Sequence, residues 1–283
     1  GQFNTLLAAV DAAGLTGTLA DPVALAGSAV SDVTLDIKAP GATGRFDGRV
    51  SLRPEVQGMI ALDSSDTATL ARALGQAIAP LPRGLGRDLK LNGALTLTRD
   101  GALALRDTLV TSGPNTLAVA ADLATGAPRP RLTAQLVTEA LDLTSLGGDS
   151  TGTGPAPAGS PATGWSTAPI DASALGLLDA EVSLSAKTID LGTTTLGTTR
   201  ALITVDRARA VASLREVQAF GGTLTGEFVA NNRNGLSVGG DLQASAIALQ
   251  QMLSELAGIT RFTGDASARV QFLGVGQSLA AIM

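Results

Sequence analysis

The sequence predicts a mainly β protein with a few short helices. Alternating apolar and polar residues recur along most of the chain, which is typical of strands with one buried face. A helix with leucines at helical spacing runs into such a strand three times, over Asn4–Leu19, Asp66–Leu97 and Ser245–Leu273, which indicates a repeat. A repeat of this kind cannot bury its apolar face alone, so we expect neighbouring copies to extend one sheet.

Four short helices are expected, each after a residue whose side chain accepts hydrogen bonds from the first helical turn. The last of them is expected to end at Gly258. The helices are Thr5–Ala13 after Asn4, Thr67–Ile78 after Asp66, Ser173–Leu178 after Asp171, and Ala246–Ala257 after Ser245.

Strands are expected in both halves of the chain. Residues 94–106 give two arms of alternating leucine around Asp100-Gly101, a pair favoured in type I′ hairpin turns, and Asn231–Gly235 gives a turn of the same kind. The other expected strands are Thr116–Leu123, Arg131–Val137, Glu181–Leu191, Arg200–Asp206, Val211–Phe220, Thr223–Ala230, Leu236–Leu242 and Asp265–Leu273.

Residues 147–164 are rich in Gly, Pro, Ser and Ala and hold almost nothing that could be buried, which predicts a linker or long loop. This segment separates a β-rich half with helix–strand repeats, residues 1–146, from a second β-rich half, residues 165–283. No apolar run approaches the length of about 18 residues that crosses a bilayer. We expect the chain to be a fragment of a longer protein, with any membrane anchor outside it.

The composition argues against most enzyme classes. The chain has no His, Cys or Tyr, so it can form neither a Ser-His or Cys-His nucleophile nor a zinc site with imidazole or thiolate ligands. Lys38, Lys90 and Lys187 lie among alternating polar residues and are expected on the wet faces of strands. A net charge of -5 and seven aromatic residues argue against nucleic acid as a partner. The sequence predicts no enzymatic activity, no cofactor and no metal site.

Several short motifs have structural explanations. The acids of Asp63-Ser-Ser-Asp66 suit a helix cap better than a calcium loop, which needs spaced ligands and a distal Glu. Gly84-Leu-Gly86 and Gly274-Val-Gly276 lack the third glycine of a dinucleotide loop and are expected to be turns. Asp241 and Glu255 have no visible partner at the spacing of an acid–base pair and are expected at the surface.

One motif leads to a family resemblance. Phe220-Gly221-Gly222, followed by Gly226, permits a tight reversal or bulge that a side chain would block. With Gly164-Trp165, Pro169–Asp171 and Leu175–Ala180 before it, this segment resembles the AsmA family of Gram-negative bacteria. The first half resembles it through residues 58–62, 81–85, 129–132 and 140–143.

The resemblance covers most of residues 45–280 through several short motifs in order, with Trp165, Phe220, Gly221, Gly222 and Gly226 as its structural residues. The chain departs from the family pattern in having no N-terminal membrane helix, in stopping before the usual C-terminal end, and in carrying Phe220 where the aromatic residue is often Tyr.

The resemblance implies an elongated, strongly curved antiparallel sheet that forms a groove similar to that of bridge-like lipid transfer proteins. It implies a periplasmic protein tethered to the inner membrane and active in outer-membrane biogenesis, which conducts phospholipid acyl chains between the two membranes. The implied partners are a phospholipid or other membrane lipid, the membrane through an anchor absent from this chain, and an outer-membrane or envelope protein.

The candidate groove residues are apolar side chains expected on one face of the strands. Alternation leaves open whether this face lines an open groove or closes into a core. A second hypothesis is a scaffold that assists assembly of outer-membrane proteins by offering edge strands to a partner. The candidates are Leu95, Leu97, Leu103, Leu105, Val182, Leu184, Ile203, Val205, Leu224, Phe228, Val270 and Phe272.

Overall fold

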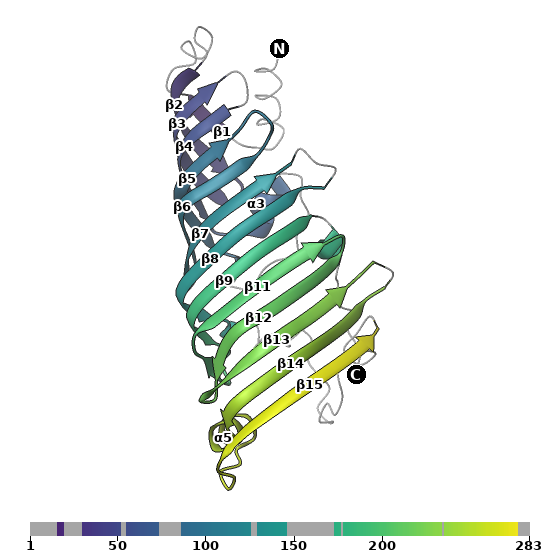
Figure 1. Ribbon diagram of the computed structural model, residues 1–283. Helices are drawn as coiled ribbons and strands as arrows, with labels where there is room; N and C mark the ends of the chain where they lie inside the picture. The colour runs from purple at the N-terminus through teal and green to yellow at the C-terminus, as the bar shows by residue number, and fades with distance from the viewer. Residues whose placement is uncertain are drawn as a thin grey trace, which may run out of the picture. The chain divides into compact units, whose positions relative to one another are not determined.

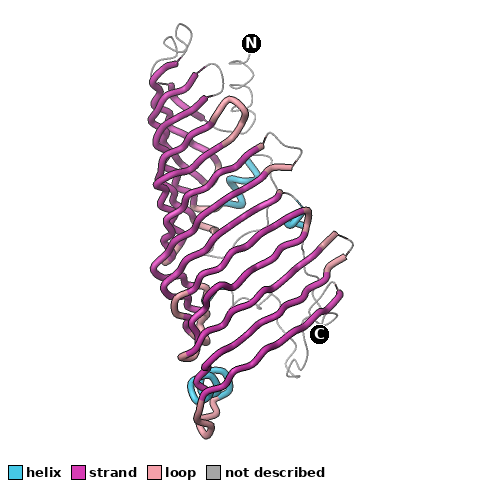
Figure 2. Tube along the Cα trace, viewed as in Figure 1, coloured by secondary structure: helices cyan, strands magenta, loops and turns pink. Residues whose placement is uncertain are grey.

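The computed structural model describes residues 16–19, 30–51, 55–73, 86–125, 129–145, 173–176, 178–233 and 235–276. Within them the protein is mainly β, with long antiparallel strands and two short α-helices (Figures 1 and 2), which confirms the predicted fold class. The helix expected at Thr5–Ala13, the linker at residues 147–164 and Trp165 lie outside these ranges. The predicted domain boundary therefore stays a prediction.

The chain forms two compact units, residues 1–128 with 135–138 and residues 129–134 with 139–283. Strand β8 (Arg131–Asp142) contributes residues to both. In each unit the strands pair antiparallel in the order of the chain, except that β9 pairs with β11 and the short β10 pairs with β9 off this path. Unit 1 holds β1 (Thr16–Leu19), β2 (Val30–Ala39), β3 (Ala42–Ser51), β4 (Glu55–Ser64), β5 (Leu89–Leu97), β6 (Leu103–Ser112) and β7 (Asn115–Ala124). Unit 2 holds β9 (Asp179–Asp190), β10 (Thr195–Leu196), β11 (Thr199–Asp206), β12 (Arg209–Ala219), β13 (Gly222–Asn231), β14 (Ser237–Ala248) and β15 (Asp265–Val275).

Helix α3 (Thr67–Ala73) begins where the sequence predicts. The Oδ1 atom of Asp66 accepts hydrogen bonds from the backbone N–H groups of Ala68 at 3.1 Å and Thr69 at 3.4 Å, as expected of a cap residue. Residues 173–176 form a 3₁₀ turn, η1 (Ser173–Gly176), where a helix is predicted to Leu178.

The predicted start of the last helix, at Ala246 after Ser245, is wrong. Strand β14 continues to Ala248, and helix α5 (Leu249–Ala257) begins without a side-chain cap. Ile247 and Ala248 still pair with β15 beyond a register shift, so pairing across the sheet extends the strand through the expected cap. The helix ends as predicted, at Gly258 in the left-handed conformation with φ of 67°.

The predicted repeat is larger than one helix and one strand. Three paired strands, a helix and a further strand form β2–β3–β4–α3–β5 in unit 1 and β12–β13–β14–α5–β15 in unit 2. In both copies the segment entering the helix donates a hydrogen bond to the turn between the first two strands. Ser65 N lies 2.9 Å from Gly41 O, and Ala248 N lies 2.8 Å from Phe220 O.

The turn at Phe220-Gly221 is as tight as its glycines suggest. Both residues have positive φ, 49° and 73°, and Ala219 pairs with Gly222, so this is a two-residue type I′ turn. A Cβ atom on Gly222 would lie 2.4 Å from Ser245 O. Glycine at this position therefore allows β13 and β14 to approach each other closely.

The turn at Asp100-Gly101 differs from the prediction. A type I′ turn needs positive φ at both residues, but here only Gly101 has it, at 80°. Thr98 N donates to Ala102 O at 2.8 Å, and Gly101 N donates to Thr98 O at 3.0 Å. The hairpin therefore closes through a three-residue loop, Arg99–Gly101.

Strands β3 and β4 are absent from the predicted strands, because glycines replace apolar side chains on one of their faces. Gly48 and Gly58 pair directly, and the Phe46 ring lies against both. A Cβ atom on either glycine would lie 2.7 Å from Phe46 Cζ. Phe46 is buried, with 5% of its surface exposed, so one aromatic ring supplies the packing of two absent side chains.

Among the strand pairs whose register the structure describes, five contain a shift: β5–β6, β6–β7, β11–β12, β12–β13 and β14–β15. Such bulges bend the strand that carries the extra residue and increase its twist. Gly226 lies opposite Leu214 beside one of these shifts, with φ of 134°.

We predict that Gly226→Ala destabilises the protein by about 3 kcal/mol, because this φ is unfavourable for a residue with a side chain. The new Cβ would also lie 2.1 Å from Asp241 O. Denaturant unfolding measures the loss. Gly176→Ala is the matched control, since a Cβ there meets no atom within 4 Å. Equal stability of the two variants would contradict the close approach at Gly226.

Candidate functional site

In unit 2 the strand register aligns apolar residues in rows that cross six strands. We call the four rows together the apolar face of unit 2. The two central rows are Val182, Ile203, Ala212, Phe228, Gly240 and Phe272, and Leu184, Ala201, Leu214, Gly226, Leu242 and Val270. The flanking rows are Ala180, Val205, Ala210, Ala230, Val238 and Gly274, and Ala186, Thr199, Val217, Leu224, Ala244 and Ala268.

Several large side chains on this face are exposed. The exposed fractions are 37% for Ile203, 40% for Phe228, 55% for Val270 and 37% for Phe272. The rings of Phe228 and Phe272 lie 5.9 Å apart, centroid to centroid, across the intervening strand. Water therefore reaches an apolar surface that would be buried in an ordinary sandwich or barrel core.

Burial on this face increases toward the strand ends near α5. Val217, Ala219 and Ile247 are buried there, and Ile247 lies two residues before the helix begins. In unit 1, Ala42 and Ser64 are directly paired and buried near the start of α3. Each helix thus follows a strand end at which residues of the apolar face are buried.

Unit 1 has an apolar face built in the same way. Leu95 pairs with Leu105, and Leu97 pairs with Leu103. These pairs belong to longer rows, which are Val33, Gly48, Gly58, Leu95, Leu105 and Ala121, and Val56, Leu97, Leu103 and Leu123.

The register brings the twelve predicted groove residues together within their units. Leu95, Leu97, Leu103 and Leu105 share the apolar face of unit 1, and the other eight share that of unit 2. Their binding role stays a prediction. Sequence reasoning missed Leu214, Leu242 and the apolar residues of β2–β4, although the alternation of Val33, Leu35 and Ile37 was a readable signal.

The opposite faces carry exposed ion pairs between neighbouring strands. Lys90 Nζ lies 2.9 Å from Asp63 Oδ2, and Lys187 Nζ lies 2.5 Å from Glu139 Oε2. Both lysines, and Lys38 as well, are exposed on their strands as predicted. Asp241 pairs with Arg269, and Glu255 accepts hydrogen bonds from Thr194 and Gln251. Neither acid has a second carboxylate among these partners, and Glu255 is exposed as expected; the partners come from other strands and loops or, for Gln251, from the adjacent helical turn.

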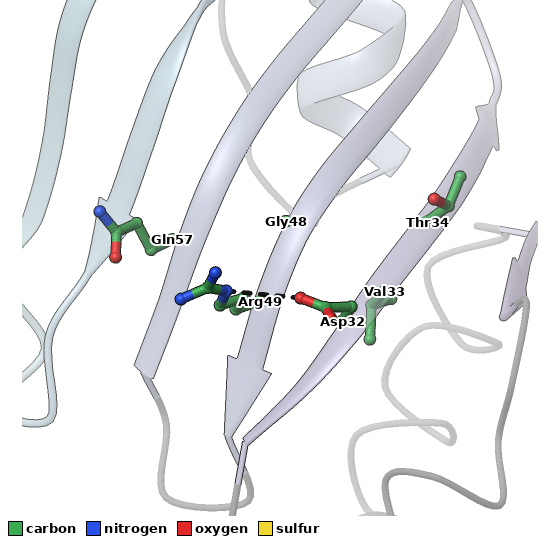
Figure 3. Close-up of a pocket in the computed structure, with 6 residues that line it drawn as sticks. All are labelled: Asp32, Val33, Thr34, Gly48, Arg49 and Gln57. Atoms are coloured by element: carbon green, nitrogen blue, oxygen red, sulfur yellow. Dashed lines mark ion pairs between the residues drawn. The ribbon is translucent and has the colours of Figure 1, made fainter.

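A hollow of about 600 Å³ lies over β2, β3 and β4 (Figure 3). Asp32 Oδ1 and Arg49 Nε lie 3.4 Å apart in its lining, and Gln57 lines it from the next strand. The side chains of Asp32 and Arg49 are 91% and 72% exposed, and such pairs interact weakly because water screens them. We find no paired carboxylates or activated nucleophile in this hollow.

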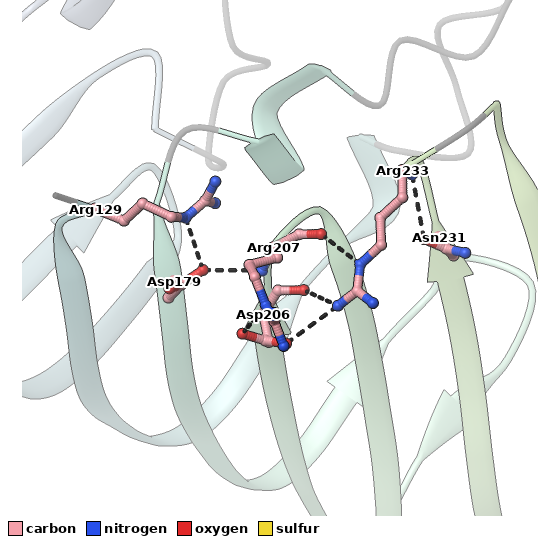
Figure 4. Close-up of polar contacts among 6 residues, drawn as sticks. All are labelled: Arg129, Asp179, Asp206, Arg207, Asn231 and Arg233. Atoms are coloured by element: carbon pink, nitrogen blue, oxygen red, sulfur yellow. Dashed lines mark hydrogen bonds and ion pairs between the residues drawn. The ribbon is translucent and has the colours of Figure 1, made fainter.

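Arg129, Arg207 and Arg233 lie at one end of unit 2, which we call the arginine-rich rim (Figure 4). Arg129 Nε donates to Asp179 Oδ1 at 3.1 Å, and the same oxygen accepts from Arg207 N at 2.9 Å. Arg233 Nε donates to Arg207 O at 2.8 Å, and its Nη2 donates to Asp206 O at 3.0 Å. These bonds hold the turn of Arg207 and Ala208, both of which have positive φ. The side chains therefore stabilise a type I′ turn built without glycine.

The described residues contain no cluster of three acidic, His or Cys side chains that could hold a metal ion. Nor is any helix in the described ranges long and apolar enough to cross a membrane.

No family model, curated protein or solved structure matches this chain.

Asp241 gives a test of the polar face. Hydrogen bonds from Arg269 and Gln271 lower the pKa of Asp241 to about 2 from its ordinary value of 3.8. A lowered folded-state pKa stabilises the protein above the ordinary value, and this contribution is lost as the pH falls toward 2. We predict that Asp241→Asn reduces the fall in melting temperature between pH 4 and pH 2.

The control is Asp265→Asn on the paired strand β15, because Asp265 makes no ion pair among the described residues. It should leave the pH dependence unchanged. If the melting temperature of the Asp241 variant fell between pH 4 and pH 2 by as much as that of the wild type, this ion pair would not contribute to stability in acid.

Proposed function

We propose that this protein binds lipid acyl chains on the apolar faces of its sheets and conducts them without enzymatic chemistry. The observation that carries the proposal is the exposed apolar face of unit 2, where rows of Val, Ile, Leu, Phe, Ala and Gly cross six strands. A lipid that leaves the membrane needs such a surface, because each methylene exposed to water costs about 0.8 kcal/mol.

The dimensions of the face suit acyl chains that lie across the strands. Six strands spaced about 4.8 Å apart span roughly 24 Å, and an extended acyl chain of sixteen carbons is about 20 Å long. Two central rows lie side by side, so a pair of chains from one lipid fits across them. The small side chains of these rows, Ala201, Ala212, Gly226 and Gly240, leave room between the larger ones.

The charged opposite faces support the same function. Exposed cross-strand ion pairs keep one side of each sheet in water and set the lipid on the other. The resemblance to the AsmA family adds the setting. We propose that the protein acts in the periplasm, tethered to the inner membrane, in phospholipid transport for outer-membrane biogenesis.

Mass spectrometry of lipids that copurify with the chain under native conditions tests the proposal first. We expect stoichiometric phospholipid that can be removed with detergent and reloaded. A stable, lipid-free protein that does not take up added lipid would reject it.

We predict that replacing Leu184 and Ile203 by Asp lowers lipid uptake at least tenfold while the strands remain, because a carboxylate on this face opposes contact with acyl chains. Uptake is measured with a fluorescent phospholipid, and circular dichroism reports the fold. Thr204→Asp is the control, since Thr204 follows Ile203 on β11 and lies on the opposite face. Unfolding of the double variant with intact Thr204→Asp would indicate a closed core. Unchanged lipid uptake in a folded double variant would exclude this face as the binding site.

The edge strand β15 favours a second candidate function, a scaffold that pairs with an extended segment of an envelope protein. Its outer edge has no partner strand within the described sheet, and Leu273 and Val275 are 81% and 69% exposed. Such edges accept added strands.

We predict that Leu273→Lys with Val275→Lys abolishes any strand-mediated association and leaves lipid uptake unchanged, because both residues lie on the face opposite the apolar rows. Sedimentation velocity measures association, and the lipid assay above measures uptake. Loss of lipid binding in this variant would connect the two surfaces and contradict their separation.

A further inference from the structure

The outer edge of β15 lacks the features by which proteins protect a sheet edge, which are shortness, proline, a bulge or an outward charge. The strand has eleven residues, and none of them is proline. The register shift in its pairing bulges the neighbouring strand, where Ser245 and Ala246 of β14 lie opposite Ser267 alone. β15 is therefore long and regular, and its outer edge has no partner strand within the described sheet.

The polar side chains of β15 turn toward β14 and away from this edge. Arg269 Nε donates to Asp241 Oδ1 at 2.8 Å, and Gln271 Nε2 donates to Asp241 Oδ2 at 2.9 Å. Ser267 Oγ accepts from a backbone N–H of β14 at 3.3 Å. Apart from Asp265 at the start of the strand, Arg269 is the only charged residue of β15, and its charge is neutralised across the sheet.

Two large apolar side chains of β15 also lean inward, one on each face. A Cβ atom on Gly240 would lie 2.6 Å from Phe272 Cε1, and one on Gly239 would lie 3.3 Å from Leu273 Cδ1. Two adjacent glycines of β14 thus make room for these side chains. Because the side chains lie over β14, they leave the outer backbone groups of β15 open to another strand.

β15 is complementary to a second copy of itself. Two copies that pair antiparallel about a two-fold axis keep their faces aligned, because residues directly opposite each other point to the same side of the sheet. With Val270 opposite Val270, all eleven residues pair and exchange about ten backbone hydrogen bonds. The other pairs are Ala268 with Phe272 and Ala266 with Gly274 on the apolar face, and Arg269 with Gln271, Ser267 with Leu273 and Asp265 with Val275 on the polar face.

This register is more favourable than its neighbours. It sets no two like charges opposite each other, whereas a shift that brings Arg269 opposite Arg269 does, which is destabilising. A shift in the other direction, with Gln271 opposite Gln271, leaves Asp265 and Ala266 beyond the end of the partner strand. The sequence of β15 therefore specifies one register with itself.

We propose that β15 pairs with β15 of a second copy of this chain, antiparallel and with Val270 at the two-fold axis. The inference goes beyond the proposed function and does not depend on lipid binding. The pairing joins the apolar faces of the two copies, because the central row that ends at Val270 continues into the same row of the second copy. It also occupies the edge that an extended segment of an envelope protein would use.

Sedimentation velocity of the full chain, freed of lipid, tests the pairing over a range of concentrations. We expect a monomer–dimer equilibrium. Val270→Lys should weaken dimerisation about tenfold, because two lysines would then face each other. An equimolar mixture of Val270→Lys and Val270→Asp should recover the dimer. Val30→Lys is the control, since Val30 is exposed to a similar extent on β2 of unit 1, and it should change nothing.

A cysteine scan tests the register. The chain has no cysteine, so Val270→Cys introduces a single thiol. Mild oxidation should link two copies through it, because opposite Cβ atoms lie about 5 Å apart. Ala266→Cys should not form a link, because in this register it lies roughly 27 Å from its counterpart. Val270→Cys decides the test if Val270→Lys does not fold. Amide hydrogens of β15 should also exchange more slowly as the concentration rises.

A chain that stays monomeric at all concentrations would overturn the proposal, as would a dimer that Val270→Lys leaves intact. Loss of the dimer in Val30→Lys would place β2 in the contact and reject the two-fold pairing. A disulfide in Ala266→Cys but not in Val270→Cys would reject the register and the proposal with it. None of these outcomes bears on lipid uptake, which the assay above measures separately.

Discussion

The antiparallel register of neighbouring strands is the constraint on which the rest of the structure depends. Successive side chains point to opposite sides of a strand, so a slip of one residue would exchange the two faces. Two-residue turns, such as Arg207-Ala208 and Phe220-Gly221, fix the register at the hairpins that they close. The apolar rows, the ion pairs and the rim all follow from this alignment.

The charged faces specify the register more than they stabilise it. Cross-strand pairs such as Lys90 with Asp63 are largely exposed, and exposed pairs contribute little free energy because water and salt screen them. Opposite charges nevertheless face each other across strands, whereas a slipped register would separate them or bring an apolar residue opposite a charge. The same side chains keep this face hydrated, which leaves the apolar face as the surface for contact.

Much of the fold was readable from the sequence, since alternation identified most strands of unit 2 and Asp66 marked the start of α3. The predictions failed where tertiary contacts override a local pattern: glycines beneath Phe46 hid β3 and β4, and pairing with β15 carried β14 past Ser245. The candidate groove residues could be predicted because alternation along a strand is enough to show which side chains share a face. The partner of Asp241 could not be predicted, because Arg269 lies 28 residues away and the sequence does not show how their strands align.

The pairing of each strand with its neighbour in the sequence also affects how each unit folds. Contacts between adjacent hairpins join residues close in the chain, so the entropy lost in closing each loop is small. Folding can begin at any stable hairpin and spread by adding strands, as in other repeat proteins. Stability in such an array is local, so amide hydrogens of an outer strand such as β15 should exchange sooner than those of central strands such as β12.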